Sequence, residues 1–173
     1  YALAAFCGVP LDDYTAGFMT SSGQFVNRTA ARQIAAANGQ ILPGVVELLD
    51  ELDAHAVPIG MASSSSSEWV RGNLERLGLL DRFEVIVTRD DVTAAKPSPE
   101  LYLRACVGLA VEPTGAVALE DSLHGVTSAR AAGMAVVAVP GRLTAGLDFS
   151  AASLVVGSLS DVGLDALGSL VGS

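Results

Sequence analysis

Basic residues are scarce in this sequence. Its 173 residues include 10 Lys and Arg against 19 Asp and Glu, which gives a formal net charge of -9. A protein that holds nucleic acid or an anionic membrane surface needs an excess of positive charge, so this balance argues against both partners. A negatively charged protein can still bind a phosphate group, but only where several donors are gathered locally.

Cysteine and long apolar runs are also scarce. The two cysteines, Cys7 and Cys106, lie far apart in apolar, helical patterns, which favours free buried thiols in a reducing compartment over a disulfide. The sequence contains no signal peptide, no lipidation motif and no apolar run long enough to span a membrane. These absences predict a cytoplasmic protein.

After residue 40 the sequence alternates regularly between strand and helix patterns. Half of all residues are hydrophobic, which is enough for a sizeable core. Short apolar runs predict strands at 58–62, 83–87, 116–119, 135–139 and, more weakly, 154–156, and helical spacing predicts helices at 43–52, 68–77, 100–107, 125–132 and 161–170. Apolar strands separated by helices predict an α/β fold with a parallel sheet.

Residues 1–40 follow a different pattern. The first seven residues have the composition of a helix that Gly8 ends, residues 17–29 are polar and irregular, and residues 30–37 are helical again. No strand is expected in this part. We therefore expect residues 1–40 to be a helical unit and residues 41–173 to be the α/β domain.

Two adjacent carboxylates follow the apolar strand pattern at 116–119. Glu120 and Asp121 come directly after it, and Ser122 leads into the next helix. Two carboxylates at a buried strand end repel each other and lose hydration, so a cation is expected between them, and Mg²⁺ prefers such oxygen ligands. The alternative is structural, with Asp121 or Ser122 capping the helix that follows.

The same sheet edge is expected to collect two further groups, because the carboxyl ends of parallel strands meet there. Five serines, Ser63 to Ser67, join a strand to a helix and offer hydroxyls and backbone N–H groups to an anion. A helix N-cap is the alternative role for these serines. Lys96 lies in a loop stiffened by Pro97 and Pro99, so we expect its ammonium group to be held in one direction.

An anion cradle, a fixed cation and a pair of carboxylates are the groups that phosphoryl transfer requires. No Ser-His-Asp triad and no His/Cys metal cluster competes with this interpretation. Asp12 and Asp13 follow no predicted strand, so neither is expected to be the nucleophile. Asp90 and Asp91 do follow a strand, but we expect them to shape the loop that carries Lys96.

Residues 43–142 resemble the core of haloacid dehalogenase (HAD) superfamily hydrolases, in the branch of phosphoglycolate phosphatase and β-phosphoglucomutase. The resemblance rests on three segments in the family's order and strand context: Met61-Ala62-Ser63-Ser64-Ser65, Lys96-Pro97-Ser98-Pro99 and Leu119-Glu120-Asp121-Ser122 with Gly125. It implies a three-layer, Rossmann-like core with a parallel sheet, and a small helical cap that is incomplete here.

The resemblance also implies roles for individual residues. Ser63 and Lys96 would be catalytic and would bind the transferring phosphate together with the Ser64 amide, and Ser65 would touch the substrate. Glu120 and Asp121 would hold Mg²⁺, directly or through water. These six positions are the candidate site: Ser63, Ser64, Ser65, Lys96, Glu120 and Asp121.

The sequence departs from the family at its first motif, Asp-x-Asp-Gly-Thr, which supplies the aspartate nucleophile after an N-terminal strand. That motif is absent, so we expect residues 1–40 to be part of the cap, residues 41–173 to be the core without its first strand, and the nucleophile to lie upstream of Tyr1.

The resemblance predicts a Mg²⁺-dependent phosphatase of small phosphorylated metabolites that works through an aspartyl-phosphate intermediate. A β-phosphoglucomutase-type phosphomutase is the nearest alternative, although the region 17–29 lacks the Arg-x-x-Ser-Leu stretch typical of those enzymes. A catalytically inactive HAD-like or receiver-like phosphate-binding module is the alternative from another class. We expect a monomer or weak homodimer, with no nucleic acid or membrane partner.

Overall fold

The structure is a computed structural model that describes residues 2–4, 18–19, 25–26, 41, 43–141 and 144–171. The strands of the main sheet are β1 (Ala2–Ala4), β4 (Ile59–Ala62), β5 (Val85–Val87), β6 (Ala116–Glu120), β7 (Ala135–Ala138) and β8 (Leu154–Val155). The helices are α2 (Val45–Ala54), α3 (Ser67–Arg76), α4 (Glu100–Gly108), α5 (Leu123–Ala131) and α6 (Leu164–Val171). Short 3-10 turns occur at η1 (Leu80–Arg82), η2 (Arg89–Asp91), η3 (Pro113–Gly115) and η4 (Leu159–Asp161).

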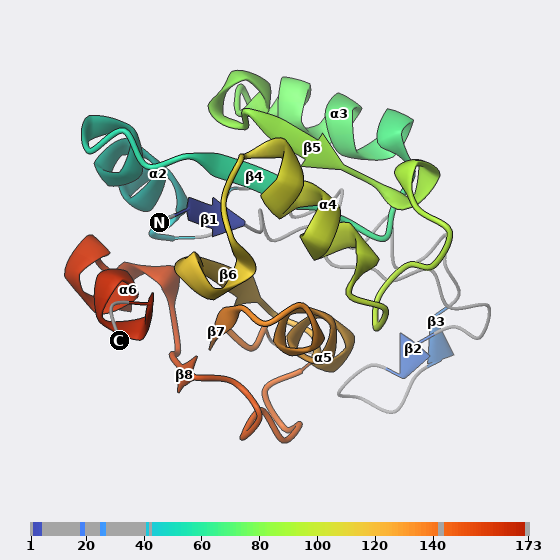
Figure 1. Ribbon diagram of the computed structural model, residues 1–173. Helices are drawn as coiled ribbons and strands as arrows, with labels where there is room; N and C mark the ends of the chain where they lie inside the picture. Colours follow the sequence, from blue (N-terminus) through green and yellow to red (C-terminus); the bar gives the residue numbers. More distant parts are fainter. Residues whose placement is uncertain are drawn as a thin grey trace.

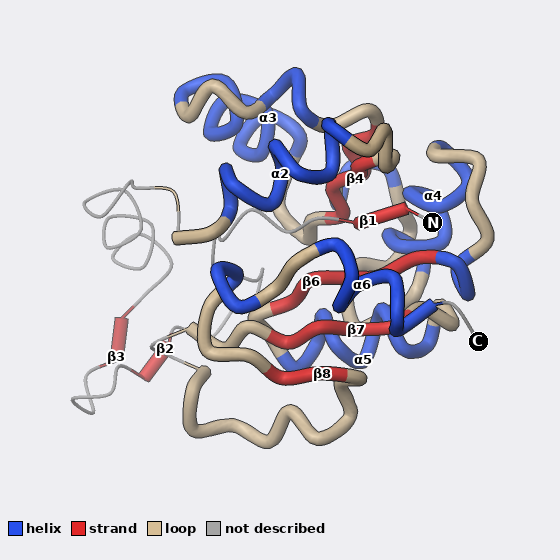
Figure 2. The backbone as a smooth tube through the Cα atoms, turned by 90° about the vertical axis from the view of Figure 1, so that its left-hand side faces the viewer, coloured by secondary structure: helices blue, strands red, loops and turns tan. Residues whose placement is uncertain are grey.

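The centre of the molecule is a six-stranded sheet in the order β5-β4-β1-β6-β7-β8 (Figures 1 and 2). Every neighbouring pair in it is parallel. Each strand and helix expected after residue 40 is present within a few residues of its predicted bounds. The expected α/β fold with a parallel sheet is therefore confirmed.

Helices cover both faces of the sheet, so the fold has three layers. One core cluster contains the buried residues of α2, α3 and α6, and the other contains those of α4 and α5. In Figure 2, α2 and α6 lie in front of the sheet and α5 lies behind it. Strand β6 serves both clusters, because Val117 and Leu119 pack on one side while Ala116 and Ala118 pack on the other.

The expected helix at residues 1–7 is wrong, since Ala2–Ala4 forms strand β1. This strand pairs with both β4 and β6 in the middle of the sheet, so the core does not lack a central strand in the structure. A short run of apolar residues fits a buried strand as well as a helix, and here the open backbone groups of two neighbouring strands decide between them.

The expectation that residues 1–40 contain no strand is wrong, because besides β1 they contain two further strands. Strands β2 (Phe18–Met19) and β3 (Phe25–Val26) form an antiparallel pair within the segment expected to be irregular. The expected helix at 30–37 lies outside the described residues. The division into a cap at 1–40 and a core at 41–173 therefore stays a prediction.

Two expectations from composition can be compared with the described part of the chain. Cys106 is a free, buried thiol as expected, and burial raises its pKa; Cys7 lies outside the described residues. Among the helices that the structure describes, none is long and apolar enough to cross a membrane.

Candidate active site

Polar groups follow three strands of the sheet at its carboxyl edge. Ser63 comes directly after β4, Thr88 directly after β5, and Glu120 is the last residue of β6. Because these strands are parallel, their carboxyl ends lie at one edge. The sequence prediction that the serine run and the acid pair share this edge agrees with the observed topology.

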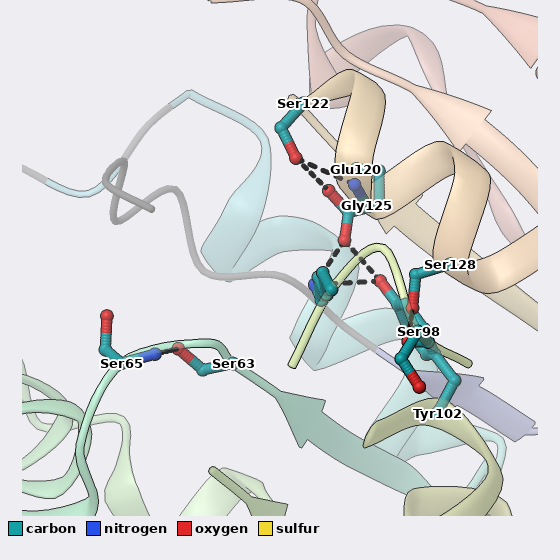
Figure 3. Close-up of polar contacts among 9 residues, drawn as sticks. Ser63, Ser65, Ser98, Tyr102, Glu120, Ser122, Gly125 and Ser128 are labelled. Atoms are coloured by element: carbon teal, nitrogen blue, oxygen red, sulfur yellow. Dashed lines mark hydrogen bonds and ion pairs between the residues drawn. The ribbon is translucent and has the colours of Figure 1, made fainter. Parts of the chain in front are cut away.

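The most buried polar cluster at this edge joins Lys96, Glu120 and Tyr102. The Lys96 ammonium and the Tyr102 hydroxyl both contact Oε1 of Glu120. Figure 3 shows the Tyr102 and Glu120 side chains pointing toward each other. Lys96 Nζ also lies 3.2 Å from the Tyr102 hydroxyl and 4.7 Å from the centre of its ring. The side chains of Lys96 and Glu120 are only 5% and 1% exposed, so the ion pair is shielded from water.

The second carboxylate oxygen of Glu120 is held by the start of α5. The Ser122 hydroxyl donates to Oε2 over 3.2 Å and accepts the backbone N–H of Gly125 over 3.0 Å. The alternative that Ser122 caps the following helix is thus confirmed, because its side chain is the N-cap of α5. A Cβ atom on Gly125 would lie 1.8 Å from Oε2 of Glu120, so only glycine leaves room for the carboxylate.

Tyr102 acts as a neutral donor in this cluster. Burial and the neighbouring Glu120 carboxylate raise the pKa of its phenol well above the ordinary value. Removing the proton would leave a second anion beside a buried carboxylate. The hydroxyl therefore stays protonated near neutral pH and can donate to Glu120.

The cation beside Glu120 in the structure is the Lys96 ammonium, whereas the sequence suggested a metal ion. Oε1 of Glu120 is taken by Lys96 and Tyr102. Asp121 lies next to it in the chain, half-buried, directly before α5. Within residues 43–141 and 144–171, no three or more His, Cys, Asp or Glu side chains form a metal-binding group. The metal roles of Glu120 and Asp121 stay predictions.

The loop that carries Lys96 is fixed by a carboxylate that the sequence analysis did not single out. Glu100, in the first turn of α4, accepts the backbone N–H groups of Thr93 and Ala94 at 3.0–3.1 Å. These bonds hold the pKa of Glu100 below its ordinary value of 4.5. Beyond Lys96, the Ser98 N–H closes a turn on the Ala95 carbonyl at 3.0 Å.

The serine run after β4 forms a turn of its own, which Figure 3 draws apart from the Glu120 cluster. The Ser63 N–H donates to the carbonyl of Val87 on the neighbouring strand, and the Ser63 hydroxyl accepts the Ser65 N–H over 3.2 Å. The Ser64 hydroxyl is buried and has no hydrogen-bond partner among the residues that the structure describes. A buried hydroxyl without a partner is costly to keep, unless a ligand completes it.

The alternative that the serines are only a helix cap finds little support in these contacts. Ser66 is the N-cap of α3, but its side chain makes no capping hydrogen bond. Instead, Oδ2 of Asp90 accepts the Ser67 N–H over 2.8 Å. Asp90 therefore braces the serine turn, and not the Lys96 loop as we expected.

Asp91 has a local structural role as well. Its carboxylate accepts the N–H and the hydroxyl of Thr88, both over 2.8 Å, and closes a capping box on η2. These hydrogen bonds lower the pKa of Asp91. The expectation that Asp91 shapes the lysine loop is therefore replaced by a role at the end of β5.

Sequence reasoning missed Tyr102 and Glu100. A usable signal existed for Tyr102, because it shares the apolar face of α4 with Leu101, Ala105 and Cys106, and a buried tyrosine hydroxyl needs a partner. For Glu100 the signal was weaker. A carboxylate in a first helical turn usually stabilises its own helix, and the sequence does not show that it reaches back to a loop.

Comparison with known proteins gives the class of this chain. The haloacid dehalogenase-like hydrolase family matches residues 2–139, so the chain belongs to that family. It is 48% identical to YhcW of Bacillus subtilis (strain 168) over 107 residues. This alignment covers 62% of this chain and 49% of YhcW. It is 40% identical over 140 residues to CbbY of Rhodobacter capsulatus, covering 76% of this chain and 60% of CbbY.

A solved structure shows the same architecture. CbbY from Rhodobacter sphaeroides, crystallised with phosphate, aligns with a TM-score of 0.72 and 32% identity, over 80% of this chain and 64% of that one. The chain thus spans about half to two-thirds of the length of these relatives. The β-phosphoglucomutase of Bacillus subtilis (strain 168) is a further relative, 35% identical over 73% of this chain and 54% of its own length.

Proposed function

We propose that this protein is a Mg²⁺-dependent phosphatase of small phosphorylated metabolites, in which Ser63, Ser64 and Lys96 bind the transferring phosphoryl group and Ser65 touches the substrate. The proposed reaction passes through an aspartyl-phosphate on a residue upstream of Tyr1, and the proposed location is the cytoplasm. The substrate class is supported by CbbY from Rhodobacter sphaeroides, a mutant of which was crystallised with xylulose-(1,5)bisphosphate, and by the name of β-phosphoglucomutase.

The observation that carries this proposal is the burial of the Lys96 ammonium group. It is the only lysine in the sequence, and its side chain is 5% exposed at the carboxyl edge of the sheet. Burying an ammonium group is unfavourable unless it is paired, and a buried ion pair contributes little net stability. A lysine kept there is better explained by charge neutralisation of a ligand than by stabilisation of the fold.

The residues at the site fit Mg²⁺. This ion is usually held by one or two carboxylates, with waters and phosphate oxygens completing the shell, and it does not need a cage of protein ligands. Asp121 would supply a direct carboxylate ligand. Glu120, already held by Lys96 and Ser122, would act on the ion through water or a remaining lone pair. Bound Mg²⁺ would draw charge from the phosphoryl oxygens.

The chain's own residues would bind and orient the phosphoryl group. The Ser63 hydroxyl and the Ser64 N–H would hold two of its oxygens, and Lys96 would neutralise the charge that they share with the nucleophile. A carboxylate oxygen then attacks phosphorus while the ester P–O bond breaks and the leaving oxygen takes a proton. Water afterwards hydrolyses the acyl phosphate and releases inorganic phosphate.

The test is phosphate release by the full-length gene product, first from p-nitrophenyl phosphate and then from a panel of sugar phosphates, phosphoglycolate and nucleoside monophosphates. We expect release that requires Mg²⁺ and falls at least about 100-fold in Lys96→Ala and in Asp121→Asn, because each removes a charge that acts on the reacting group. Arg76→Ala removes an exposed cation from the last turn of α3 and is the matched control.

The proposal fails if neither variant loses activity while both remain folded by circular dichroism, or if the wild type releases no phosphate from any substrate with Mg²⁺ present. Transfer of phosphate between two positions of a sugar phosphate, without net release, would favour the phosphomutase alternative. Binding of orthophosphate without turnover would favour the inactive binding module.

A further inference from the structure

A hydrogen bond from a buried serine joins α5 to the loop that carries Lys96. The Ser128 hydroxyl donates to the backbone carbonyl of Ser98 over 2.6 Å. Figure 3 shows these two residues close together. Ser128 is 0% exposed, and the two residues are separated by thirty positions in the chain. A helix position that faces the interior is usually apolar, so a buried serine with a single directed bond calls for an explanation.

Helix α5 already holds the other half of the site. Ser122 at its N-cap binds Oε2 of Glu120, and Asp121 lies directly before it. Ser128 lies in the middle of the same helix and binds the lysine loop two residues after Lys96. One rigid element therefore contacts both the acid pair and the loop that supplies the cation.

Ala95 of the lysine loop packs against the core cluster that contains buried residues of α5 and β6, but apolar packing does not fix direction as a hydrogen bond does. The loop's other hydrogen bonds among the described residues are local. Glu100 fixes Thr93 and Ala94 before Lys96, and the turn from Ala95 to Ser98 is closed within the loop itself. Neither contact relates the loop to β6 or α5. The bond from Ser128 does so through the main chain, whereas the contact of Lys96 with Glu120 does so only through a flexible side chain.

We propose that Ser128 is a positioning residue, whose hydroxyl holds the Lys96 loop at a fixed distance from Glu120 and Asp121. The effect on catalysis rests on the function proposed above, but the effect on Lys96 itself does not. A small displacement of a group that acts on a reacting atom is costly, and one lost buried hydrogen bond is enough to permit it.

The decisive variant is Ser128→Ala, which removes the hydroxyl and leaves a good helix former that needs no more room. Thr127→Ala, at the exposed neighbouring position of α5, is the matched control. Ser128→Cys keeps a side chain of similar size with a weak donor and is expected to fall between wild type and Ser128→Ala.

The first readout does not depend on activity. Acetic anhydride labels amines, and peptide mass spectrometry then gives the labelling rate of Lys96 alone. We expect the buried ammonium to react at least about threefold faster in Ser128→Ala than in wild type and Thr127→Ala, because the loop has lost a hydrogen bond that holds it. Equal rates in all three folded proteins would overturn the proposal.

The second readout is kinetic. We expect Ser128→Ala to lower kcat for p-nitrophenyl phosphate about tenfold with a smaller change in KM, because the misplaced cation acts mainly on the transition state. In a Lys96→Arg background we expect Ser128→Ala to change the logarithm of kcat by less than half as much. The reason is that the Lys96 ammonium, which Ser128 is proposed to position, has been replaced. A full tenfold loss in both backgrounds would indicate a general structural role and contradict the proposal.

The two readouts separate the two proposals. If wild type releases no phosphate but Lys96 labelling rises in Ser128→Ala, the proposed function fails and the positioning role stands. If phosphate release requires Lys96 but Ser128→Ala matches wild type in both readouts, the function stands and the positioning role fails.

Discussion

Glu120 is the residue that Lys96, Tyr102 and Ser122 contact together. It is 1% exposed, and its two oxygens receive an ammonium, a phenol and a serine hydroxyl. A buried carboxylate is unfavourable alone, and these donors offset its lost hydration. Removal of any one donor should therefore show in stability as well as in activity.

The clearest case is Tyr102→Phe, which deletes one donor and keeps the ring. We expect the free energy of unfolding to fall by about 1–3 kcal/mol, because a buried charged acceptor loses a hydrogen bond. We also expect kcat/KM to fall, since Lys96 and Glu120 lose a shared partner. Urea denaturation monitored by circular dichroism measures the first effect. A variant as stable as wild type would show that the phenol does not support Glu120.

Gly125→Ala tests the steric requirement beside the same carboxylate. The added Cβ would lie 1.8 Å from Oε2 of Glu120, so the carboxylate or the helix must move. We expect a loss of about 1–3 kcal/mol or more in the free energy of unfolding. Gly72→Ala in α3 is the control, because apart from the backbone of its own helix no described residue beyond its chain neighbours lies within 4 Å of the added methyl group. It should be neutral or stabilising by up to about 1 kcal/mol.

At the scale of elements, the loops of the site are held by hydrogen bonds with side chains of other segments. Asp90 braces the serine turn, Glu100 braces the start of the lysine loop, and Ser128 braces its end. In each case a side chain caps backbone groups that would otherwise lack partners. The polar groups are thus held in place before any ligand binds.

Glu100 gives this arrangement a pH dependence. Its folded-state pKa is depressed below 4.5 by the amides of Thr93 and Ala94, so its stabilising contribution is complete above that pH. The contribution is lost as the pH falls through the depressed pKa. We expect Glu100→Gln to lower the melting temperature at pH 7, and the difference from wild type to shrink as the pH is lowered below 4.5.

Thermal melts at several pH values between neutral and acid conditions measure this difference. Glu75→Gln, at an exposed position on α3, is the charge-matched control. A melting-temperature difference for Glu100→Gln that stays constant over the whole pH range would contradict the role of the ionised carboxylate.

The elements after residue 40 could be predicted from sequence because their patterns are local. Apolar runs such as Ala116 to Leu119 and helical spacing such as Val45 to Leu52 specify strands and helices directly. Strand β1 could not be predicted this way. Alanine and leucine favour a helix locally, so the place of Ala2–Ala4 between β4 and β6 is a tertiary effect that overrides this preference.

The candidate site was predictable in its position but not in its contacts. The topological rule for parallel sheets places Ser63 and Glu120 at the same edge. The contacts themselves join segments that are distant in the sequence. They include the pair of Lys96 and Glu120, the bond of Tyr102 to Glu120 and the bond of Ser128 to the lysine loop. No spacing in the sequence encodes such distances.

At the scale of the whole molecule, the described residues form a parallel α/β core whose carboxyl edge gathers the polar and charged groups of three loops. The chain belongs to the haloacid dehalogenase-like hydrolases, and the proposed phosphatase activity follows from the arrangement at this edge. Whether the serine turn, Lys96 and Asp121 surround a single phosphoryl group is the claim on which that proposal depends.

A crystal of the full-length gene product soaked with tungstate, a heavy analogue of phosphate, and Mg²⁺ tests this claim most directly. The account predicts a tungsten peak in the anomalous difference map at the carboxyl edge of the sheet, with the oxygens of the anion contacting Ser63 Oγ and Lys96 Nζ and the metal ion beside Asp121. A map with tungsten bound elsewhere, or with Lys96 still paired only to Glu120 and no anion near the serine turn, would contradict it.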